Sequence, residues 1–180
     1  MQTWIALFRG INVGGNNILP MAELRALIER LGMTKVRTYI QSGNAVFSAS
    51  KGTATVLQNR IANEVESQFA FKPRILLMKR EKFVDSVASN PFPEGALDPK
   101  SVHFFFLEDV PLNPDLELLN QVKADSERFH LVQDIFYLHA PDGIGRSKLA
   151  SKVEKALGVV GTGRNYRTVA KLMDLASKGE

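Results

Sequence analysis

The sequence contains no cysteine among its 180 residues. This absence excludes disulfide bonds, a thiolate nucleophile, and zinc or iron–sulfur sites that depend on sulfur ligands. Histidine is scarce as well, with only His103, His130 and His139. None belongs to a His-x-x-x-His pair or to another spacing that is typical of metal ligands. We therefore expect no metal and no cofactor, and we expect the histidines to be structural.

Long apolar runs are also missing, because no stretch reaches the length that a membrane-spanning helix needs. The first nine residues, MQTWIALFR, combine a short apolar run with no basic region before it. They therefore do not resemble a secretory signal peptide. These features predict a cytoplasmic protein without a membrane partner. The sequence does not indicate an oligomeric state.

The composition predicts a folded protein, since 44% of the residues are hydrophobic and 23% are charged. The net charge of +4 is distributed unevenly along the chain. Residues 146–180 hold eight basic and three acidic residues, whereas residues 1–145 hold 15 basic and 16 acidic ones. The last fifth of the chain is therefore electropositive. Such a segment favours anionic partners, although a solvated helix face is an equally good interpretation.

Hydrophobic periodicity predicts the secondary structure of the first half of the chain. Apolar runs indicate strands, and apolar residues three or four positions apart indicate helices. The expected order is strand, helix, strand, strand, helix, strand, which is a split βαβ or ferredoxin-like unit. The corresponding segments are 3–8, 20–31, 36–40, 44–47, 56–69 and 74–78.

The same kind of pattern returns after a stretch rich in proline and glycine at residues 90–95. Here Asn113 is the expected N-cap of the first helix, and a helix takes the place of the final strand. The expected segments are 102–107, 114–122, 128–132, 135–138, 147–157 and 165–176. The fold class is therefore α+β, with two ferredoxin-like (α/β plait) subdomains, of which the second is incomplete or modified at its C-terminus. We expect the subdomains to span 1–79 and 101–180, joined by a connector with a short helix at 80–100.

A loop rich in glycine and asparagine, RGINVGGNN, follows the first expected strand. Its glycines do not have the spacing of a dinucleotide-binding loop, and no lysine follows them as in a Walker A loop. Two interpretations remain. Backbone N–H groups of the loop could bind an anion, or the glycines and asparagines could serve only to form turns with positive φ.

The plait topology brings this loop to the same sheet edge as the turn after the second strand. Polar residues that converge at one edge can form a small ligand site. None of them is a general base with a pKa near neutrality. The candidate ligand-binding residues of this edge are Arg9, Gly10, Asn12, Gly14 and Gly15 from the loop, and Gln41, Ser42 and Asn44 from the turn.

Two further candidates are the basic segments that open the last two expected helices. Ser147 is a good N-cap with cations on either side, and Asn165 or Thr162 could cap the last helix. Each segment is either an anion site or an ordinary capped helix. A polymer could contact both helix starts more easily than one small ligand could. The candidate residues are Arg146, Ser147 and Lys148 in the first segment, and Arg164, Asn165 and Arg167 in the second.

Aromatic residues on the first and third strands raise an alternative ligand face. RNA-recognition plaits stack bases on aromatics at these positions, and Trp4, Phe8 and Phe47 could share one face. The basic-Gly-aromatic signature of such domains is absent from SGNAVFSA. We therefore expect this face to pack on the second plait or on a partner.

Four motifs together resemble the bacterial domain-of-unknown-function family numbered 1697. They are FRGINVGGNNILPMAELRALIERLG, YIQSGNAVF, NPFP and TGRNYRTVAKL. The resemblance covers nearly the whole chain and implies an α+β protein of two ferredoxin-like subdomains, but it implies no activity. The last motif departs from the family pattern Thr-Arg-Asn-Trp-Asn-Thr-Val, since Gly163 precedes the arginine and Tyr166-Arg167 replaces Trp-Asn.

These observations predict a binding protein for an anionic ligand, with nucleic acid backbone as the favoured class. One alternative is an enzyme that acts on a phosphorylated or carboxylated small molecule at the RGINVGG loop, although no catalytic residue can be named. Another alternative is a module that binds a protein partner through its sheet face. The sequence does not choose between DNA and RNA.

Overall fold

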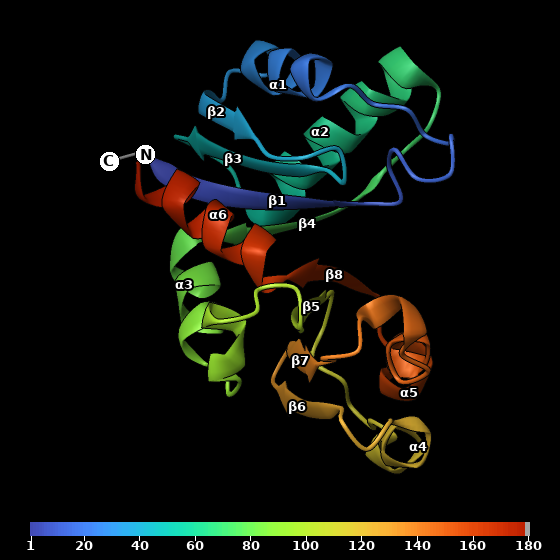
Figure 1. Ribbon diagram of the computed structural model, residues 1–180. Helices are drawn as coiled ribbons and strands as arrows, with labels where there is room; N and C mark the ends of the chain where they lie inside the picture. The colour runs from blue at the N-terminus through green and yellow to red at the C-terminus, as the bar shows by residue number, and fades with distance from the viewer. Residues whose placement is uncertain (179–180) are drawn as a thin grey trace. The chain divides into compact units, whose positions relative to one another are not determined.

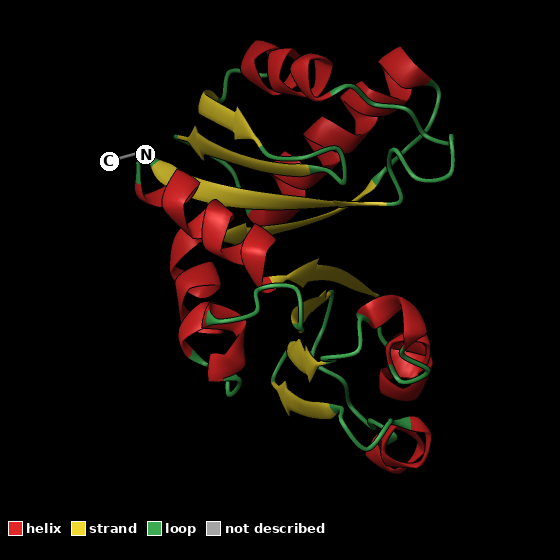
Figure 2. Ribbon diagram, viewed as in Figure 1, coloured by secondary structure: helices red, strands yellow, loops and turns green. Residues whose placement is uncertain are grey.

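The structure is a computed structural model in which residues 1–178 are described. The chain divides into two compact units. Unit 1 comprises Met1–Asp85 together with the chain from Ala170 onward, and unit 2 comprises Ser86–Val169. Each unit contains one four-stranded antiparallel sheet. The described residues form a mixed α+β fold with six α-helices, which Figures 1 and 2 show.

Unit 1 follows the expected order of elements. The strands are β1 (Gln2–Arg9), β2 (Thr34–Thr38), β3 (Asn44–Ala49) and β4 (Arg74–Lys79), and the helices between them are α1 (Met21–Arg30) and α2 (Ala54–Phe69). In the sheet the strands lie in the order β2-β3-β1-β4. Both connecting helices lie on one face of this sheet (Figure 1).

The core of unit 1 explains why these segments form. Alternate residues of β1, namely Trp4, Ala6 and Phe8, are buried in one cluster with Leu24 and Ile61 of the two helices. Every second residue of the strand points to the helices, and residues three or four positions apart on each helix point to the strand, so these two sets of side chains pack together. The aromatic face of β1 is consequently covered by the helices of its own unit. The expectation that it packs on the second plait or on a partner is wrong, and the burial of Trp4, Phe8 and Phe47 also contradicts the alternative that these rings stack RNA bases.

Unit 2 repeats the order of unit 1. Its strands are β5 (Val102–Leu107), β6 (Arg128–Val132), β7 (Ile135–His139) and β8 (Gly161–Asn165), and its helices are α4 (Leu116–Val122) and α5 (Val153–Leu157). The strands lie in the order β6-β7-β5-β8. A buried cluster joins Phe136 and Leu138 of β7 to Leu119 of α4 and to Val153 of α5.

Three expectations about unit 2 are wrong. A final strand is present, because β8 pairs antiparallel with β5. The segment expected as a helix at 147–157 contains only the short α5, preceded by 3-10 turns at Ile144–Arg146 and Ala150–Lys152. The N-cap of α4 is Asp115, whose carboxylate accepts from the Leu118 N–H at 2.9 Å, and not Asn113.

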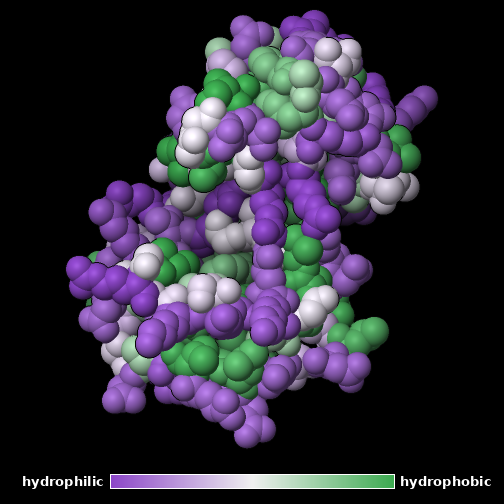
Figure 3. Space-filling view, turned by 90° about the vertical axis from the view of Figure 1, so that its right-hand side faces the viewer, coloured by the Kyte–Doolittle hydropathy of each residue, from purple (hydrophilic) through white to green (hydrophobic). Residues whose placement is uncertain are grey.

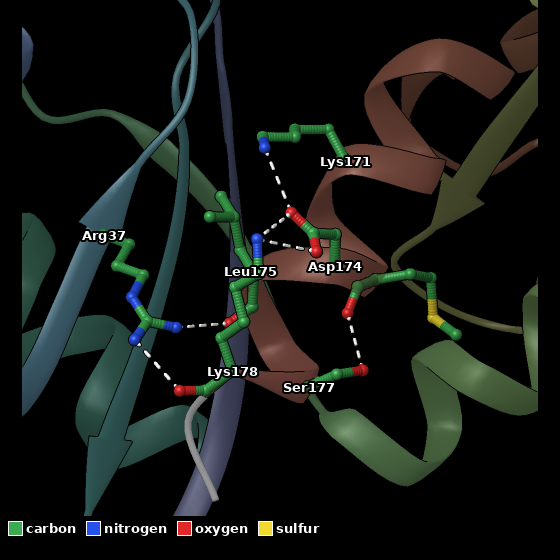
Figure 4. Close-up of polar contacts among 7 residues, drawn as sticks. Arg37, Lys171, Asp174, Leu175, Ser177 and Lys178 are labelled. Atoms are coloured by element: carbon green, nitrogen blue, oxygen red, sulfur yellow. Dashed lines mark hydrogen bonds and ion pairs between the residues drawn. The ribbon is translucent and has the colours of Figure 1, made fainter.

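The boundary between the two units falls within α3 (Arg80–Ala88) and again within α6 (Tyr166–Ser177). The C-terminal end of α6 belongs to unit 1, where it is held by Arg37 of β2 (Figure 4). The Arg37 guanidinium donates to the carbonyl oxygens of Leu175 and Lys178 at 2.8 and 3.0 Å. Leu175 lies in the last turn of α6 and Lys178 directly follows the helix, and carbonyl groups at a helix end have no partner within the helix.

No helix among residues 1–178 is both long and apolar enough to cross a membrane. The expected boundaries of the subdomains at 79 and 101 stay predictions.

Candidate functional site

The RGINVGGNN loop lies between β1 and α1, and the side chain of Asn12 makes three of the hydrogen bonds that hold it. The Asn12 amide nitrogen donates to the carbonyl oxygens of Leu19 and Gln41 at 2.9 and 2.8 Å, and its amide oxygen accepts from the Leu19 N–H at 2.7 Å. Asn12 has a φ of +54°, which asparagine tolerates better than most residues. Loop and turn therefore meet at one edge of the sheet, as the topology predicts.

The turn after β2 packs closely under this loop. Gly43 has a φ of +81°, and its carbonyl oxygen accepts from the Phe8 N–H at 2.9 Å. A Cβ on Gly43 would lie 2.5 Å from Ile11 Cδ1 and 2.7 Å from Phe8 Cβ. Asn44 is fully buried, and its amide nitrogen donates to the Tyr39 carbonyl at 2.9 Å. These contacts give Asn12, Gly43 and Asn44 a structural role.

The outer surface of this edge contains the remaining candidates of unit 1. Gly10, Gly14, Gly15, Gln41 and Ser42 are exposed, and Arg9 is half-buried. Apolar side chains accompany them, since Val13, Ile18 and Ile40 are also exposed. Such apolar groups are scattered among hydrophilic ones on the face that Figure 3 presents. The edge therefore offers backbone amides and few charged side chains to a ligand.

Unit 2 contains a cavity with a basic lining. The cavity has a volume of about 470 Å³, and the end of α4 and the segment before α5 form its walls. Lys123 follows α4, and Arg146 and Lys148 belong to the segment before α5, with Ser147 between them. The single acid of the lining is Glu127, whose Oε2 accepts from the Ala124 N–H at 2.9 Å. The lining thus contains three cations and one carboxylate, and that carboxylate already accepts a hydrogen bond.

Hydrogen bonds hold the two walls of this cavity in place. The Ser126 hydroxyl donates to Asp142 Oδ2 at 2.6 Å and so joins the turn after α4 to the turn that follows β7. The Ser147 hydroxyl accepts from the Ala150 N–H at 2.9 Å. Ser147 is not the N-cap of a helix as expected, because the 3-10 turn Ala150–Lys152 has Leu149 at that position and α5 has Lys152.

A second cavity of about 310 Å³ adjoins the first, because Lys123 and Glu127 line both. Asn120, Arg128 and Phe129 complete its lining. The Arg128 guanidinium contacts Glu94 Oε1, lies 3.1 Å from His139 Nδ1, and sits 5.2 Å from the centre of the Phe92 ring. Its hydrogen bond to Glu94 lowers the pKa of that carboxyl below its usual value. These contacts direct the Arg128 guanidinium toward Glu94, His139 and Phe92.

The residues predicted near the last helix behave differently from the cavity cations. Arg164 lies in β8 and is buried, so the expectation that it projects from the first turn of a helix is wrong. Its Nη1 donates to the Gly163 carbonyl at 2.8 Å, and burial lowers its pKa to about 10. Asn165 caps α6, since its side chain accepts from the Thr168 N–H at 3.0 Å. Arg167 is exposed.

The predicted residues thus fall into separate groups. The candidates from Arg9 to Asn44 belong to unit 1, and those from Arg146 to Arg167 belong to unit 2. Within unit 2, the basic cavity includes Arg146, Ser147 and Lys148 but not the three candidates of the last motif. Sequence reasoning missed Lys123, for which the only signal was a cation at the end of an expected helix.

No group of three histidines or acidic residues suited to a metal occurs among residues 1–178. His103 is buried, its Nε2 has no hydrogen-bond partner, and burial lowers its pKa. The structural role predicted for the three histidines stays a prediction.

Comparison with known proteins identifies the family. The sequence profile described as "Protein of unknown function (DUF1697)" matches residues 1–137. The chain belongs to this family. The matched region of the DUF1697 protein includes the RGINVGGNN loop, Lys123 and Phe129, and it ends before Arg146 and the TGRNYRTVAKL motif.

A solved structure has the same fold as this DUF1697 protein. It is that of a conserved bacterial protein from Streptococcus pneumoniae, with a TM-score of 0.75 and 24% sequence identity. The likeness covers 97% of this chain and 98% of that one. At this identity it shows the fold alone. No curated protein matches the DUF1697 protein.

Proposed function

We propose that this DUF1697 protein binds a phosphate-bearing anion in the basic cavity of unit 2, and that nucleic acid backbone is the favoured ligand class. The observation that carries the proposal is the lining of the cavity by Lys123, Arg146 and Lys148. Lysine and arginine are the side chains that contact phosphate oxygens most often.

The electrostatics of the cavity favour an anion over a neutral ligand. Its one carboxylate, that of Glu127, already accepts a backbone hydrogen bond, which satisfies part of its charge. The cations come from two segments separated in the sequence, so a bound phosphate would be contacted from both sides. The segment that supplies Arg146 and Lys148 opens the electropositive last fifth of the chain, which would attract a polyanion over a longer range.

We favour this cavity over the RGINVGG loop as the ligand site. At the loop, the side chains of Asn12 and Asn44 already hydrogen-bond to neighbouring backbone groups. An enzyme at that edge would lack both a general base and these two amides. The loop's exposed apolar residues, such as Val13, also suit a phosphate poorly.

We further propose that both units are ferredoxin-like plaits. The support is their shared order of elements, βαββαβ, and their shared strand order, in which the first and third strands lie at the centre of the sheet. In this view the second plait is complete, because β8 takes the place of the final strand.

Fluorescence anisotropy with a labelled single-stranded oligonucleotide tests the binding proposal. The double variant Arg146→Ala/Lys148→Ala should bind at least about 10-fold more weakly at low salt, and its log–log salt slope should fall by about 1.4, which is about 0.7 per lost phosphate contact. The matched control is Lys152→Ala/Lys155→Ala, which removes the same charge from exposed residues outside the cavity lining.

Each outcome of this measurement has a clear meaning. Weaker binding by the cavity variant together with near-normal binding by the control supports the proposal. An equal loss of oligonucleotide affinity in both variants would show that only the net charge matters, and would contradict a binding site at the cavity. Absence of binding to oligonucleotides and to inorganic polyphosphate at low salt would contradict the proposed function itself.

A further inference from the structure

We infer that the ligand of unit 2 is a nucleotide unit, whose phosphate lies in the basic cavity and whose base stacks on Phe129 in the adjoining cavity. This inference rests on the proposed function and narrows it. It selects a nucleotide with an accessible base over a base-paired duplex and over bare polyphosphate.

The adjacency of the two cavities is the first observation. Lys123 and Glu127 line both of them, so the basic cavity and its neighbour lie side by side. Their linings differ in chemistry, since Arg146 and Lys148 belong only to the first and Phe129 only to the second. A ligand that fills both needs an anionic part beside a planar or apolar part. A nucleotide has this construction.

The setting of Phe129 is the second observation. Phe129 lies in β6 and is half-buried, and its ring stacks on Phe136 of β7 with a centroid separation of 5.4 Å and an interplanar angle of 21°. Phe136 is itself fully buried. One face of the Phe129 ring, which lines the cavity, therefore packs against the core of unit 2. Supported aromatic rings on strands are the platforms on which proteins stack single-stranded bases.

The Asn120 side chain also lines this cavity and could contact the base edge, because its amide offers both donors and an acceptor. The guanidinium of Arg128 lies on the other face of β6, where it contacts Glu94 and His139. Asn120 does not by itself select one base.

The position of Phe129 argues against a base-paired ligand. Bases inside a duplex are stacked on their neighbours, and a protein can reach one face only by extruding the nucleotide. Unpaired bases can instead be placed on an aromatic side chain without that cost. Bare polyphosphate would contact the cations and leave Phe129 without a role.

Two ligands share this chemistry, a free nucleotide and a nucleotide within a single strand. The test uses labelled oligothymidylate, an abasic strand of equal length and charge, the corresponding duplex, and unlabelled AMP as a competitor. The variants are Phe129→Leu, which keeps apolar bulk but removes the aromatic ring, and Phe129→Tyr, which keeps the ring. Thermal unfolding of both variants is measured alongside, because Phe129 packs on the core of unit 2.

The expected result is tighter binding of oligothymidylate than of the abasic strand or the duplex. Phe129→Leu should weaken oligothymidylate binding by about 5- to 100-fold, bring it to the level of the abasic strand, and leave abasic binding unchanged. Phe129→Tyr should bind nearly as the unaltered protein does. Displacement by AMP at concentrations similar to those of the strand's nucleotides would identify a free nucleotide as the ligand, and failure of AMP to compete would identify the strand.

Other results overturn the inference while separating it from the proposed function. If the abasic strand or the duplex binds as tightly as oligothymidylate, and the Arg146→Ala/Lys148→Ala variant still loses affinity, then the base has no site although the phosphate does. The same conclusion follows if Phe129→Leu binds all ligands normally. If no anion binds, both proposals are wrong.

Discussion

The side chain of Asn12 donates to the carbonyl oxygen of Gln41 at 2.8 Å, across a sequence separation of 29 residues. The same amide group makes two hydrogen bonds with the backbone of Leu19, at the far end of its own loop. One side chain therefore closes the loop after β1 and attaches it to the turn after β2. The amide acts together with the backbone hydrogen bond from the Phe8 N–H to the Gly43 carbonyl at the same edge.

Replacement of Asn12 should accordingly lower the stability of unit 1. Asn12→Ala leaves three backbone groups without their partners and places an alanine at positive φ, so we expect a loss of about 2–4 kcal/mol in the free energy of unfolding. Asn12→Gly removes the same hydrogen bonds without the strain at φ, and should cost about 1 kcal/mol less. Urea unfolding measures both. Equal stability of the two variants would show that strain contributes nothing here.

Gly43 and Gly10 provide a second comparison at the same sheet edge. Both have positive φ, at +81° and +70° respectively. A Cβ on Gly43 would lie 2.5 Å from Ile11 Cδ1, whereas nothing lies within 4 Å of one on Gly10. We expect Gly10→Ala to cost about 1 kcal/mol from strain alone, and Gly43→Ala to cost about 1–3 kcal/mol more from overpacking.

Thermal or urea unfolding of the two alanine variants decides this prediction. A similar loss of stability in both would mean that Ile11 and Phe8 move aside without cost, and that the close packing under the loop is not rigid.

The sequence predicted most strands and helices because their apolar periodicity was clear. It failed for β8, whose sequence GTGRN has no apolar alternation. The strand forms because of its neighbour: a Cβ on Gly161 would lie 2.8 Å from Leu107 Cδ2, and one on Gly163 would lie 3.3 Å from Phe105 Cε1. Bulky residues of β5 thus occupy the space where side chains of β8 would be. Such a complementarity between segments more than 50 positions apart cannot be seen in a local pattern.

The candidate site shows the same limit. Local signals indicated Arg146 and Lys148, which line the basic cavity. They did not indicate Lys123, because its approach to these residues depends on the path of β6 and β7 between them. The position of Arg164 was predicted wrongly for the same reason as β8. The segment that forms this strand was expected to be the start of the last helix. Ligand binding by any of these residues stays a prediction.

Tyr137 should give unit 2 a distinct response to alkaline pH. Its hydroxyl donates to the Ser86 carbonyl at 2.7 Å, and burial together with the nearby charge of Asp134 raises its pKa to about 12. The unfolded chain releases this proton near pH 10, and the folded protein keeps it. The stabilising contribution is therefore complete below pH 10 and is lost as the pH rises towards about 12, on the order of 2 kcal/mol in total.

Tyr137→Phe separates this contribution from that of other groups. The variant should be about 1 kcal/mol less stable at pH 8, because the Ser86 carbonyl loses its partner. It should then lose less stability than the unaltered protein between pH 9 and pH 11.5. Urea unfolding across this range provides the measurement, and parallel pH curves for the two proteins would contradict the prediction.

The hydrogen bond between Ser126 and Asp142 links the structure of the basic cavity to its proposed function. Ser126 donates to Asp142 Oδ2 at 2.6 Å and connects the two walls that supply Lys123 and Arg146. Ser126→Ala removes this bond and preserves every charge. We expect it to weaken anion binding by up to about 10-fold, because the two walls are no longer held together and more ordering is required when the ligand binds.

Asp142→Asn makes the opposite change, since it removes a negative charge near the cavity but keeps an oxygen that can accept from Ser126. Anion binding should then strengthen, by up to about fivefold for an exposed charge. Opposite signs in the two variants, measured by anisotropy at low salt, would show that geometry and charge act separately at this cavity. If both variants bind the anion more weakly, the Asp142 carboxylate affects binding only through its hydrogen bond to Ser126 and not through its charge. If Ser126→Ala binds normally, the walls keep their places without this bond, and the cations are positioned by the packing of α4 and α5 on the sheet.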